Sequence, residues 1–402
     1  MLARRMAFVF VALVLMLASY LYGRSESPAG VSAENRESVA LYVEALETVE
    51  KDYVGQEAID PKKQTYGAIE GMLKTLGDEG HTRFLSPEEI EQSRQGLSSK
   101  YVGVGIKLDN KDGEVVVTSP LDGSPAEEAG IESGDVLVSV DGESVKDEDI
   151  KDIADKVRGP EGSKVELTML RDEEERDFNV ERTELEVSAA SWNLIPGTDV
   201  ARLRLASFSE NSADKLAEAT AEARAAGAER FVLDLRDNAG GLVGQADDIA
   251  SQFLPAGSSI FIRKNADSEE EVTYVPDNNE PLDAPLVVLV NKGSASSTEI
   301  VAGALRDNER ARVVGETTFG TGTVLDEYTL SDGSAILLGI AEWLTPNGDF
   351  IRGSGIEPDV EVSLKEGQEP RTPEKTRDLS KEEVFKEDAQ LERAYEVLQE
   401  GD

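Results

Sequence analysis

The stretch Leu286-Val-Val-Leu-Val-Asn-Lys-Gly-Ser-Ala-Ser-Ser-Thr-Glu-Ile300 decides the fold of this chain. Its first five residues form a continuous apolar run, which is typical of a strand buried on both faces. A turn of small residues and a helix follow. A serine at such a junction can project its hydroxyl while the start of the helix offers free N–H groups and a positive dipole. Serine and threonine are also ordinary helix caps, and this structural role is preferred for Ser294, Ser297 and Thr298.

Strands and helices alternate around this stretch, over residues 187–364. Short segments of high β-propensity are followed by segments whose apolar residues recur at helical spacing. The expected strands are Ala201–Leu205, Arg230–Asp234, Leu286–Asn291 and Ala335–Ala341. The expected helices are Ser212–Ala225, Val243–Ser251 and Ser297–Arg306. The alternation predicts an α/β layer with a largely parallel sheet.

A second strand-to-helix junction lies at Phe231-Val-Leu-Asp-Leu-Arg-Asp-Asn-Ala-Gly-Gly-Leu242. Backbone amides beside its paired glycines are unobstructed and could hold an oxyanion. The alternative is an ordinary turn in which glycine supplies a positive φ. The segment taken alone favours that alternative.

Residues 98–184 combine short apolar strands, frequent glycines and two helical pieces. The run Tyr101-Val-Gly-Val-Gly-Ile106 leads into a strand, so its amides could bind a terminal carboxylate and accept a peptide as an added strand. A β-bulge or tight turn is the alternative. The candidate peptide-binding residues are Gly103, Val104, Gly105 and Ile106. Together with Ser124-Pro-Ala-Glu-Glu-Ala-Gly130 and Gly134-Asp-Val-Leu-Val-Ser-Val-Asp-Gly142, this run resembles a PDZ domain.

Taken together, the segments resemble the carboxyl-terminal processing, or tail-specific, serine proteases, as far as Gly355-Ile-Glu-Pro-Asp359. The resemblance implies an α/β fold of the crotonase or ClpP type, with an inserted or preceding PDZ domain and a helical N-terminal segment. It places the nucleophile of a Gly-Ser-Ala-Ser motif at Ser296. The oxyanion hole would consist of the amide of Ser297 and that of Gly240 or Gly241. Members of this family cleave polypeptides near exposed C-termini.

The sequence departs from the family at the general base. The family has a lysine in Phe-Gly-Lys-Gly and a glutamine four residues later, whereas this chain has Phe319-Gly-Thr-Gly-Thr-Val-Leu325. Thr321 therefore takes the position of the lysine, and Leu325 that of the glutamine. A serine hydroxyl is a poor nucleophile unless a neighbour accepts its proton, and threonine cannot serve as that base. The paired loss indicates a site remodelled toward another base or toward no catalysis.

Five residues are candidates for the missing base. Lys292 precedes the nucleophile closely but is expected at the end of a strand, pointing into solvent. His81 is the only histidine, and a structural role is expected for it. Glu299, Asp307 and Glu316 could act as carboxylate bases, although each is expected to cap the helix or to pair with an arginine.

Composition narrows the classes of function. The 402 residues include 81 acidic and 41 basic side chains, and the formal net charge is −40. Such a field disfavours nucleic acid and anionic headgroups as partners, and it fits a setting of high external salt. Without cysteine, disulfides, a thiol nucleophile and thiolate metal sites are excluded. No metal and no cofactor are expected.

The N-terminus indicates export. Arg4 and Arg5 precede the apolar run Met6–Tyr22, and polar residues follow. Because no clean small-x-small cleavage site is present, an uncleaved membrane anchor is favoured over a removed secretory signal. Basic residues before the span predict that the rest of the chain lies outside the cytoplasm.

The sequence thus predicts five regions. They are a signal anchor (1–26), a helical segment (36–97), a PDZ domain (98–184), a crotonase-like serine peptidase domain (187–364) and an acidic tail (365–402) that forms a solvated helix or is disordered. The expected protein is an extracytoplasmic serine endopeptidase that acts on polypeptides with exposed C-termini and could form homo-oligomers. One alternative is a catalytically inactive peptide-binding or adaptor protein on the same scaffold. Coenzyme A chemistry, a further alternative, is disfavoured because export separates the chain from acyl-CoA.

Overall fold

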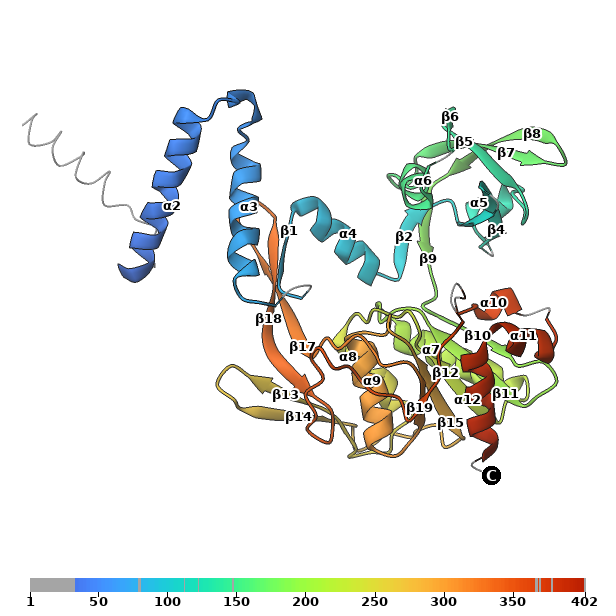
Figure 1. Cartoon of the computed structure of the whole chain (residues 1–402). Helices are drawn as coiled ribbons and strands as arrows, with labels where there is room; N and C mark the ends of the chain where they lie inside the picture. The colour runs from blue at the N-terminus through green and yellow to red at the C-terminus, as the bar shows by residue number, and fades with distance from the viewer. Residues whose placement is uncertain are drawn as a thin grey trace, which may run out of the picture. The chain divides into compact units, whose positions relative to one another are not determined.

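The computed structural model describes residues 33–78, 81–111, 113–121, 123–146, 148–365, 368, 370–376 and 379–400. The chain forms two compact units, residues 1–71 and 72–402. The first contains α2 (Ala33–Asp52), η1 (Gln56–Ala58) and most of α3 (Pro61–Lys74), as Figure 1 shows. Within the described ranges, no helix is long and apolar enough to cross a membrane. The predicted anchor at 1–26 lies outside them.

A six-stranded sheet forms the centre of the second unit (Figure 1). Its strands, in spatial order, are β10 (Ala190–Leu194), β11 (Val200–Leu205), β12 (Arg230–Asp234), β15 (Leu286–Val290), β16 (Arg312–Gly315) and β19 (Val360–Glu361). Every pair from β11 onward is parallel, and β10 is antiparallel to β11. Parallel neighbours need crossover connections, which contain α7 (Ser212–Ala225), α8 (Val243–Ser251) and α9 (Ser297–Asp307). The predicted α/β fold with a largely parallel sheet is confirmed.

The apolar run of β15 is buried on both faces of this sheet. Val288 and Val290 join the core that contains the inner residues of α7, α8 and α9. Val287 and Leu289 join a second core, together with apolar residues of α12 (Ala389–Glu400). Successive side chains of a strand point to opposite faces, so a strand covered on both sides needs apolar residues throughout.

The C-terminal region is folded, which corrects the prediction of a solvated or disordered tail. Besides α12 it contains α10 (Pro373–Thr376) and α11 (Lys381–Glu387). Val384, Leu391 and Leu398 are buried with residues of the central sheet. The acidic residues that suggested a solvated tail, such as Glu392 and Glu396, lie on the exposed face of α12. An amphipathic helix needs apolar residues on one side only.

A second sheet of this unit pairs β1, near the start of the unit, with strands of the peptidase domain. Its order is β1-β18-β13-β14, and β17 also pairs with β18. The strands are β1 (Arg83–Leu85), β13 (Ser259–Asn265), β14 (Glu270–Tyr274), β17 (Thr323–Thr329) and β18 (Ala335–Leu344). Helix α4 (Pro87–Leu97) follows β1, with Ser86 as its N-cap and Pro87 at its first position. The pairing of β1 with β18 fixes the segment just before β1 against the peptidase domain.

A β-domain with its own core lies between β2 (Lys100–Gly103) and β9 (Thr183–Glu186), which pair with each other. The order of its sheet is β3-β4-β5-β7-β8, with β6 on β5. The strands are β3 (Ile106–Lys111), β4 (Glu114–Pro120), β5 (Val136–Val140), β6 (Glu143–Ser144), β7 (Lys164–Arg171) and β8 (Glu174–Glu181), and the helices are α5 (Pro125–Glu128) and α6 (Ile150–Val157). Two short helices on a small antiparallel sheet match the PDZ-like unit predicted for this region, whose boundaries stay a prediction.

Candidate active site

Ser296 occupies the sharp turn between β15 and α9, with φ of 57° and ψ of −122°. A positive φ is strained for a residue with a side chain and costs about 1–3 kcal/mol, so the surroundings must hold it in place. The Ser296 amide donates to Glu299 Oε2 at 2.9 Å and to Thr321 Oγ1 at 3.1 Å. The side chain is half-buried, and its hydroxyl donates no hydrogen bond to a described residue. The turn therefore presents a hydroxyl whose proton is not engaged.

The other hydroxyls of this turn are all engaged. They donate to backbone oxygens of the segment after β12, each at 2.9 Å: Ser294 to Leu235, Ser297 to Gly241 and Thr298 to Asn238. These three side chains are buried and fasten the start of α9 to that segment. Their role is structural, as expected, although none of them is the N-cap. Ser296 is thus the one member of the cluster with a hydroxyl left for chemistry.

The two glycines of the loop after β12 play different parts. Gly240 has φ of +96°, and a Cβ there would lie 2.7 Å from the Ser296 Cβ, so only glycine permits this close approach. Its amide is occupied, since it donates to Asn238 Oδ1 at 2.9 Å. The amides of Gly241 and Ser297 have no acceptor in the described part of the chain. Unpaired amides beside a nucleophile can hold the oxyanion of an acyl-transfer intermediate.

Glu299 ties the turn to the loop that carries Thr321. Its carboxylate is fully buried and accepts hydrogen bonds from the Thr318 hydroxyl and from the amides of Gly320 and Thr321, at 2.7 and 2.9 Å. With the Ser296 amide, four donors share its two oxygens. Its capacity as an acceptor is used by these bonds, so Glu299 is a positioning residue. Periodicity alone placed it near the start of the helix without revealing the loop that it holds.

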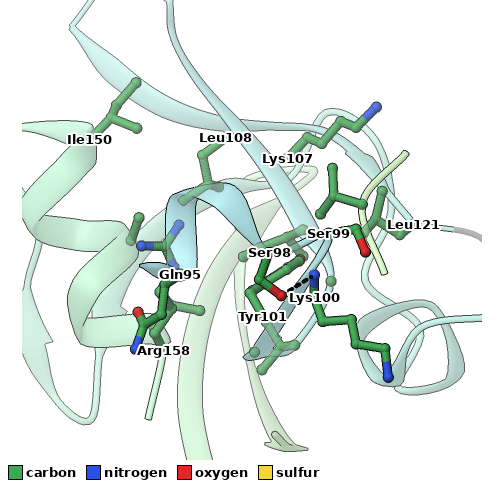
Figure 2. Close-up of a pocket in the computed structure, with 17 residues that line it drawn as sticks. Gln95, Ser98, Ser99, Lys100, Tyr101, Lys107, Leu108, Leu121, Ile150 and Arg158 are labelled. Carbon is green, nitrogen blue, oxygen red and sulfur yellow. Dashed lines mark hydrogen bonds between the residues drawn. The ribbon is translucent and has the colours of Figure 1, made fainter. Parts of the chain in front are cut away.

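The candidate peptide-binding residues line a groove of the PDZ domain with a volume of about 360 Å³ (Figure 2). Gly105 has φ of +82°, and its position is tightly enclosed, because a Cβ would lie 2.3 Å from the Ser124 Cβ. No described residue accepts a hydrogen bond from the amide of Val104 or Gly105. The apolar lining includes Ile106, Leu108, Leu121, Ile150, Ala154 and Val157. The groove thus combines free amides with an apolar wall, as recognition of a chain terminus requires.

Comparison with known proteins identifies the family. The sequence model of peptidase family S41 matches residues 199–362, and that of a PDZ domain matches 116–171. A probable CtpA-like serine protease of Staphylococcus epidermidis is 33% identical over 361 residues, which cover 90% of this chain and 72% of the relative. This chain belongs to peptidase family S41.

The S41 assignment agrees with further relatives. A probable CtpA-like serine protease of Staphylococcus aureus is 32% identical over 361 residues, covering 90% of this chain and 72% of the relative. Among solved structures, the photosystem II D1 C-terminal processing protease is 30% identical, with a TM-score of 0.48 over 83% of this chain and 94% of the other. The two sequence models and the CtpA-like relatives make the chain a serine-type peptidase of the carboxyl-terminal processing family with a PDZ domain.

Thr321 and Leu325 are the two positions at which the family resemblance implies a lysine and a glutamine. Thr321 is buried, and its Oγ1 accepts the bond from the Ser296 amide. The position expected for the lysine therefore does lie at the nucleophile turn, but it carries a hydroxyl. Leu325, on β17, is 36% exposed and brings no polar group. Neither side chain can take a proton from Ser296.

Three of the candidate bases lie away from the Ser296 turn or are otherwise engaged. Lys292 is 81% exposed and forms a 3.2 Å ion pair with Glu316. Asp307 stands at the opposite end of α9, 2.9 Å from Arg306. The solvent-facing position expected for Lys292 and the arginine partner expected for Asp307 are both observed. Glu316 pairs with lysine instead of arginine.

His81 lies beside the active-site loop. Its ring contacts the Phe319 ring edge to face, with centroids 6.1 Å apart. The Phe319 amide in turn donates to the Ser294 carbonyl at 2.9 Å. Sequence reasoning placed His81 in an N-terminal turn region with a structural role, because the pairing of β1 with β18 cannot be deduced from local patterns.

Proposed function

We propose that this S41 peptidase is an extracytoplasmic serine endopeptidase that captures polypeptide C-termini in its PDZ groove and cleaves them through an acyl-enzyme on Ser296. One observation carries the proposal: of the four hydroxyls at the β15–α9 turn, only that of Ser296 donates no hydrogen bond to a described residue. It is also the residue in a strained backbone conformation, as active-site residues often are. The arrangement matches a nucleophile presented at the start of a helix.

The chemistry follows from the groups around Ser296. Its Oγ would attack the scissile carbonyl carbon, and the carbonyl electron pair would move onto oxygen. The amides of Gly241 and Ser297 would hold that oxyanion, and removing one such donor from an oxyanion hole typically costs a factor of about 10²–10³ in kcat. Collapse would release the amine and leave an ester on Ser296, which water would then hydrolyse. Gly240 supports this site by allowing the loop to approach the nucleophile closely.

The PDZ groove supports a substrate with a free C-terminus. The amides of Val104 and Gly105 would bind the terminal carboxylate, and the last side chain would enter the apolar part of the groove. The rest of the substrate would add to the domain as a strand. The basic and apolar N-terminus, Arg4 to Tyr22, supports placing this activity outside the cytoplasm, at the membrane if the anchor is retained.

A second candidate function is a non-catalytic peptide-binding protein or adaptor. The observation that favours it is the pair Thr321 and Leu325, which removes the family's lysine and glutamine while the PDZ groove is retained. In well-studied serine proteases, loss of catalytic groups leaves a residual rate enhancement of about 10³–10⁴ over water. Weak activity and no activity are therefore different outcomes that an assay can separate.

The test is labelling of the full chain with a fluorophosphonate, which forms a stable adduct with activated serines. A peptidase gives one adduct that is lost in Ser296→Ala and kept in Ser133→Ala, a change of an exposed serine in the PDZ domain. The same preparation should cleave an unfolded polypeptide with a free C-terminus. Absence of both adduct and cleavage, with peptide binding retained, would contradict the peptidase proposal and support the adaptor.

A further inference from the structure

Three segments far apart in sequence meet beside the active-site loop. Thr82, just before β1, accepts a hydrogen bond from the Gly339 amide at 3.0 Å, and Gly339 stands opposite Leu325 in the β17–β18 register. On another side of the loop, the Gly353 amide donates to the Gly320 carbonyl at 2.9 Å. Thr82 and residues 351–355 are therefore held beside the segment that contains Thr321 and Leu325.

Asp78, His81 and Arg352 form a charged cluster at this meeting point. The Asp78 carboxylate accepts from Arg352 at 2.5 Å and from the Thr82 hydroxyl at 2.5 Å. Its Oδ1 also lies 3.4 Å from His81 Nδ1, without the geometry of a hydrogen bond. The charged group that the described structure places beside the imidazole is Asp78. Arg352 in turn binds the Asp78 carboxylate. The carboxylate is held from several sides, whereas the imidazole is not.

The imidazole of His81 is buried without using its hydrogen-bonding capacity. Neither ring nitrogen has a partner among the described residues, and the side chain is 12% exposed. Buried polar atoms nearly always have a hydrogen-bond partner, so two buried ring nitrogens without one call for an explanation. A nitrogen reserved for a substrate or for a proton in transit would provide one. The contact of the ring with Phe319 places that nitrogen next to the remodelled loop.

We propose that His81 is the general base of this peptidase, oriented by Asp78, in place of the absent lysine. The inference depends on the proposed role of Ser296. A carboxylate near Nδ1 favours the tautomer with its proton on Nδ1, which leaves the Nε2 lone pair free to accept.

The proton balance is simple. His81 Nε2 takes the proton of the Ser296 hydroxyl, directly or through one water, as the Oγ–C bond forms. The imidazolium then gives this proton to the amine as the C–N bond breaks. In deacylation it takes a proton from water and returns it to Ser296 Oγ. No other reactant is required.

Because His81 is the only histidine, its ring signals can be followed directly in the full chain by NMR. Fluorophosphonate labelling and peptide cleavage should both be lost when this ring is protonated. His81→Gln should lower kcat/KM by a factor of about 10²–10⁴, the usual contribution of a general base, and remove this pH dependence. Asp78→Asn should change the pH profile. Affinity for a C-terminal peptide, measured on the PDZ groove, should stay the same in both variants.

A purely structural histidine would leave the pH profile unchanged, and a His81→Gln protein with unchanged rate and profile overturns the inference. If Ser296→Ala remains active, the proposed function itself fails. If Ser296→Ala is inactive while His81→Gln is active, only the assignment of the base fails. Should His81→Gln not fold, carbethoxylation of the single histidine in the wild-type chain, reversed by hydroxylamine, gives the same answer. A wild-type chain that neither labels nor cleaves contradicts both proposals.

Discussion

At the scale of single residues, hydrogen bonds with neighbouring side chains hold one strained serine, Ser296, in place. Ser296 needs acceptors for its amide because its φ of 57° takes that amide out of any regular ladder. Glu299 and Thr321 supply them. The Glu299 carboxylate also accepts hydrogen bonds from the loop that contains Thr321, so one group holds both the Ser296 turn and this loop. Loss of the carboxylate should therefore disturb both the turn and the loop.

Glu299→Gln tests this dependence. The substitution replaces one oxygen by an NH₂ group, which would face N–H donors and leave at least one of them buried without an acceptor. We expect fluorophosphonate labelling of Ser296 to slow by at least about 100-fold, and the free energy of unfolding to fall by about 1–3 kcal/mol. Rapid-quench labelling and urea unfolding measure the two effects. Glu218→Gln, a matched change on the exposed face of α7, should alter neither.

At the scale of elements, the C-terminal helices are fastened to the strand that leads into the oxyanion loop. Arg236, just after β12, is fully buried and binds two carboxylates: Asp234 at 2.7 Å, and Asp388, between α11 and α12, at 2.8 Å. Burial acts to raise the pKa of Asp234, but the neighbouring guanidinium outweighs it and lowers that pKa to about 2. The predicted tail is therefore part of the support of the site.

Arg236→Met should be strongly destabilising, because it removes the guanidinium that binds two buried carboxylates and leaves Asp234 with only the longer pair to Arg204, at 3.8 Å, among the ion pairs of the described residues. We expect the free energy of unfolding to fall by about 3–5 kcal/mol at pH 7. The pH dependence has a definite sign: the folded-state pKa of Asp234 is lowered, so its contribution is present above about pH 4 and is lost as the pH falls toward 2. The difference between wild type and variant in urea unfolding should therefore shrink on acidification. Arg393→Met, which breaks only exposed pairs on α12, should leave stability nearly unchanged.

At the scale of the whole molecule, a chain of net charge −40 carries a groove whose charges are positive. Lys100, Lys107 and Arg158 line the peptide groove, and no acidic side chain does so among the residues that the structure describes (Figure 2). Lys100 pairs with Glu184 and Arg158 with Asp155, whereas no described carboxylate pairs with Lys107. The charge of Lys107 can therefore attract a negative ligand, an effect that salt screens. The groove should therefore prefer C-terminal segments that carry acidic residues.

Lys107→Glu tests this preference in the Ser296→Ala chain, which binds peptides without cleaving them. At low ionic strength the variant should bind an acidic C-terminal peptide about two- to five-fold more weakly, the range of one exposed charge pair. The difference should disappear above about 0.5 M salt. Fluorescence anisotropy measures the affinity. Lys146→Glu makes the same charge change on an exposed residue outside the groove, and an equal loss there would show that the effect is not local.

Much of the fold is determined by the sequence alone, because its signals are local. The apolar run Leu286–Val290 specifies a strand buried on both faces, and the spacing of apolar residues after Ser297 specifies the helix that follows. The motifs around Ser296 and the PDZ glycines were enough to predict the family. The threonine at position 321, where the resemblance implies a lysine, is also visible in the sequence. The assignment of Ser296 as nucleophile stays a prediction.

Tertiary structure decides what depends on contacts between distant segments. Only the folded chain shows that the hydroxyls of Ser294, Ser297 and Thr298 donate hydrogen bonds to the segment after β12. It also shows that the amide of Gly240 is bonded, whereas the amide of Gly241 has no acceptor among the described residues. It also buries the acidic C-terminal helices and brings His81 to Phe319. Periodicity reports which face of an element is apolar. It does not report which partner that face contacts, because contacts between residues hundreds of positions apart form only when the whole core packs together.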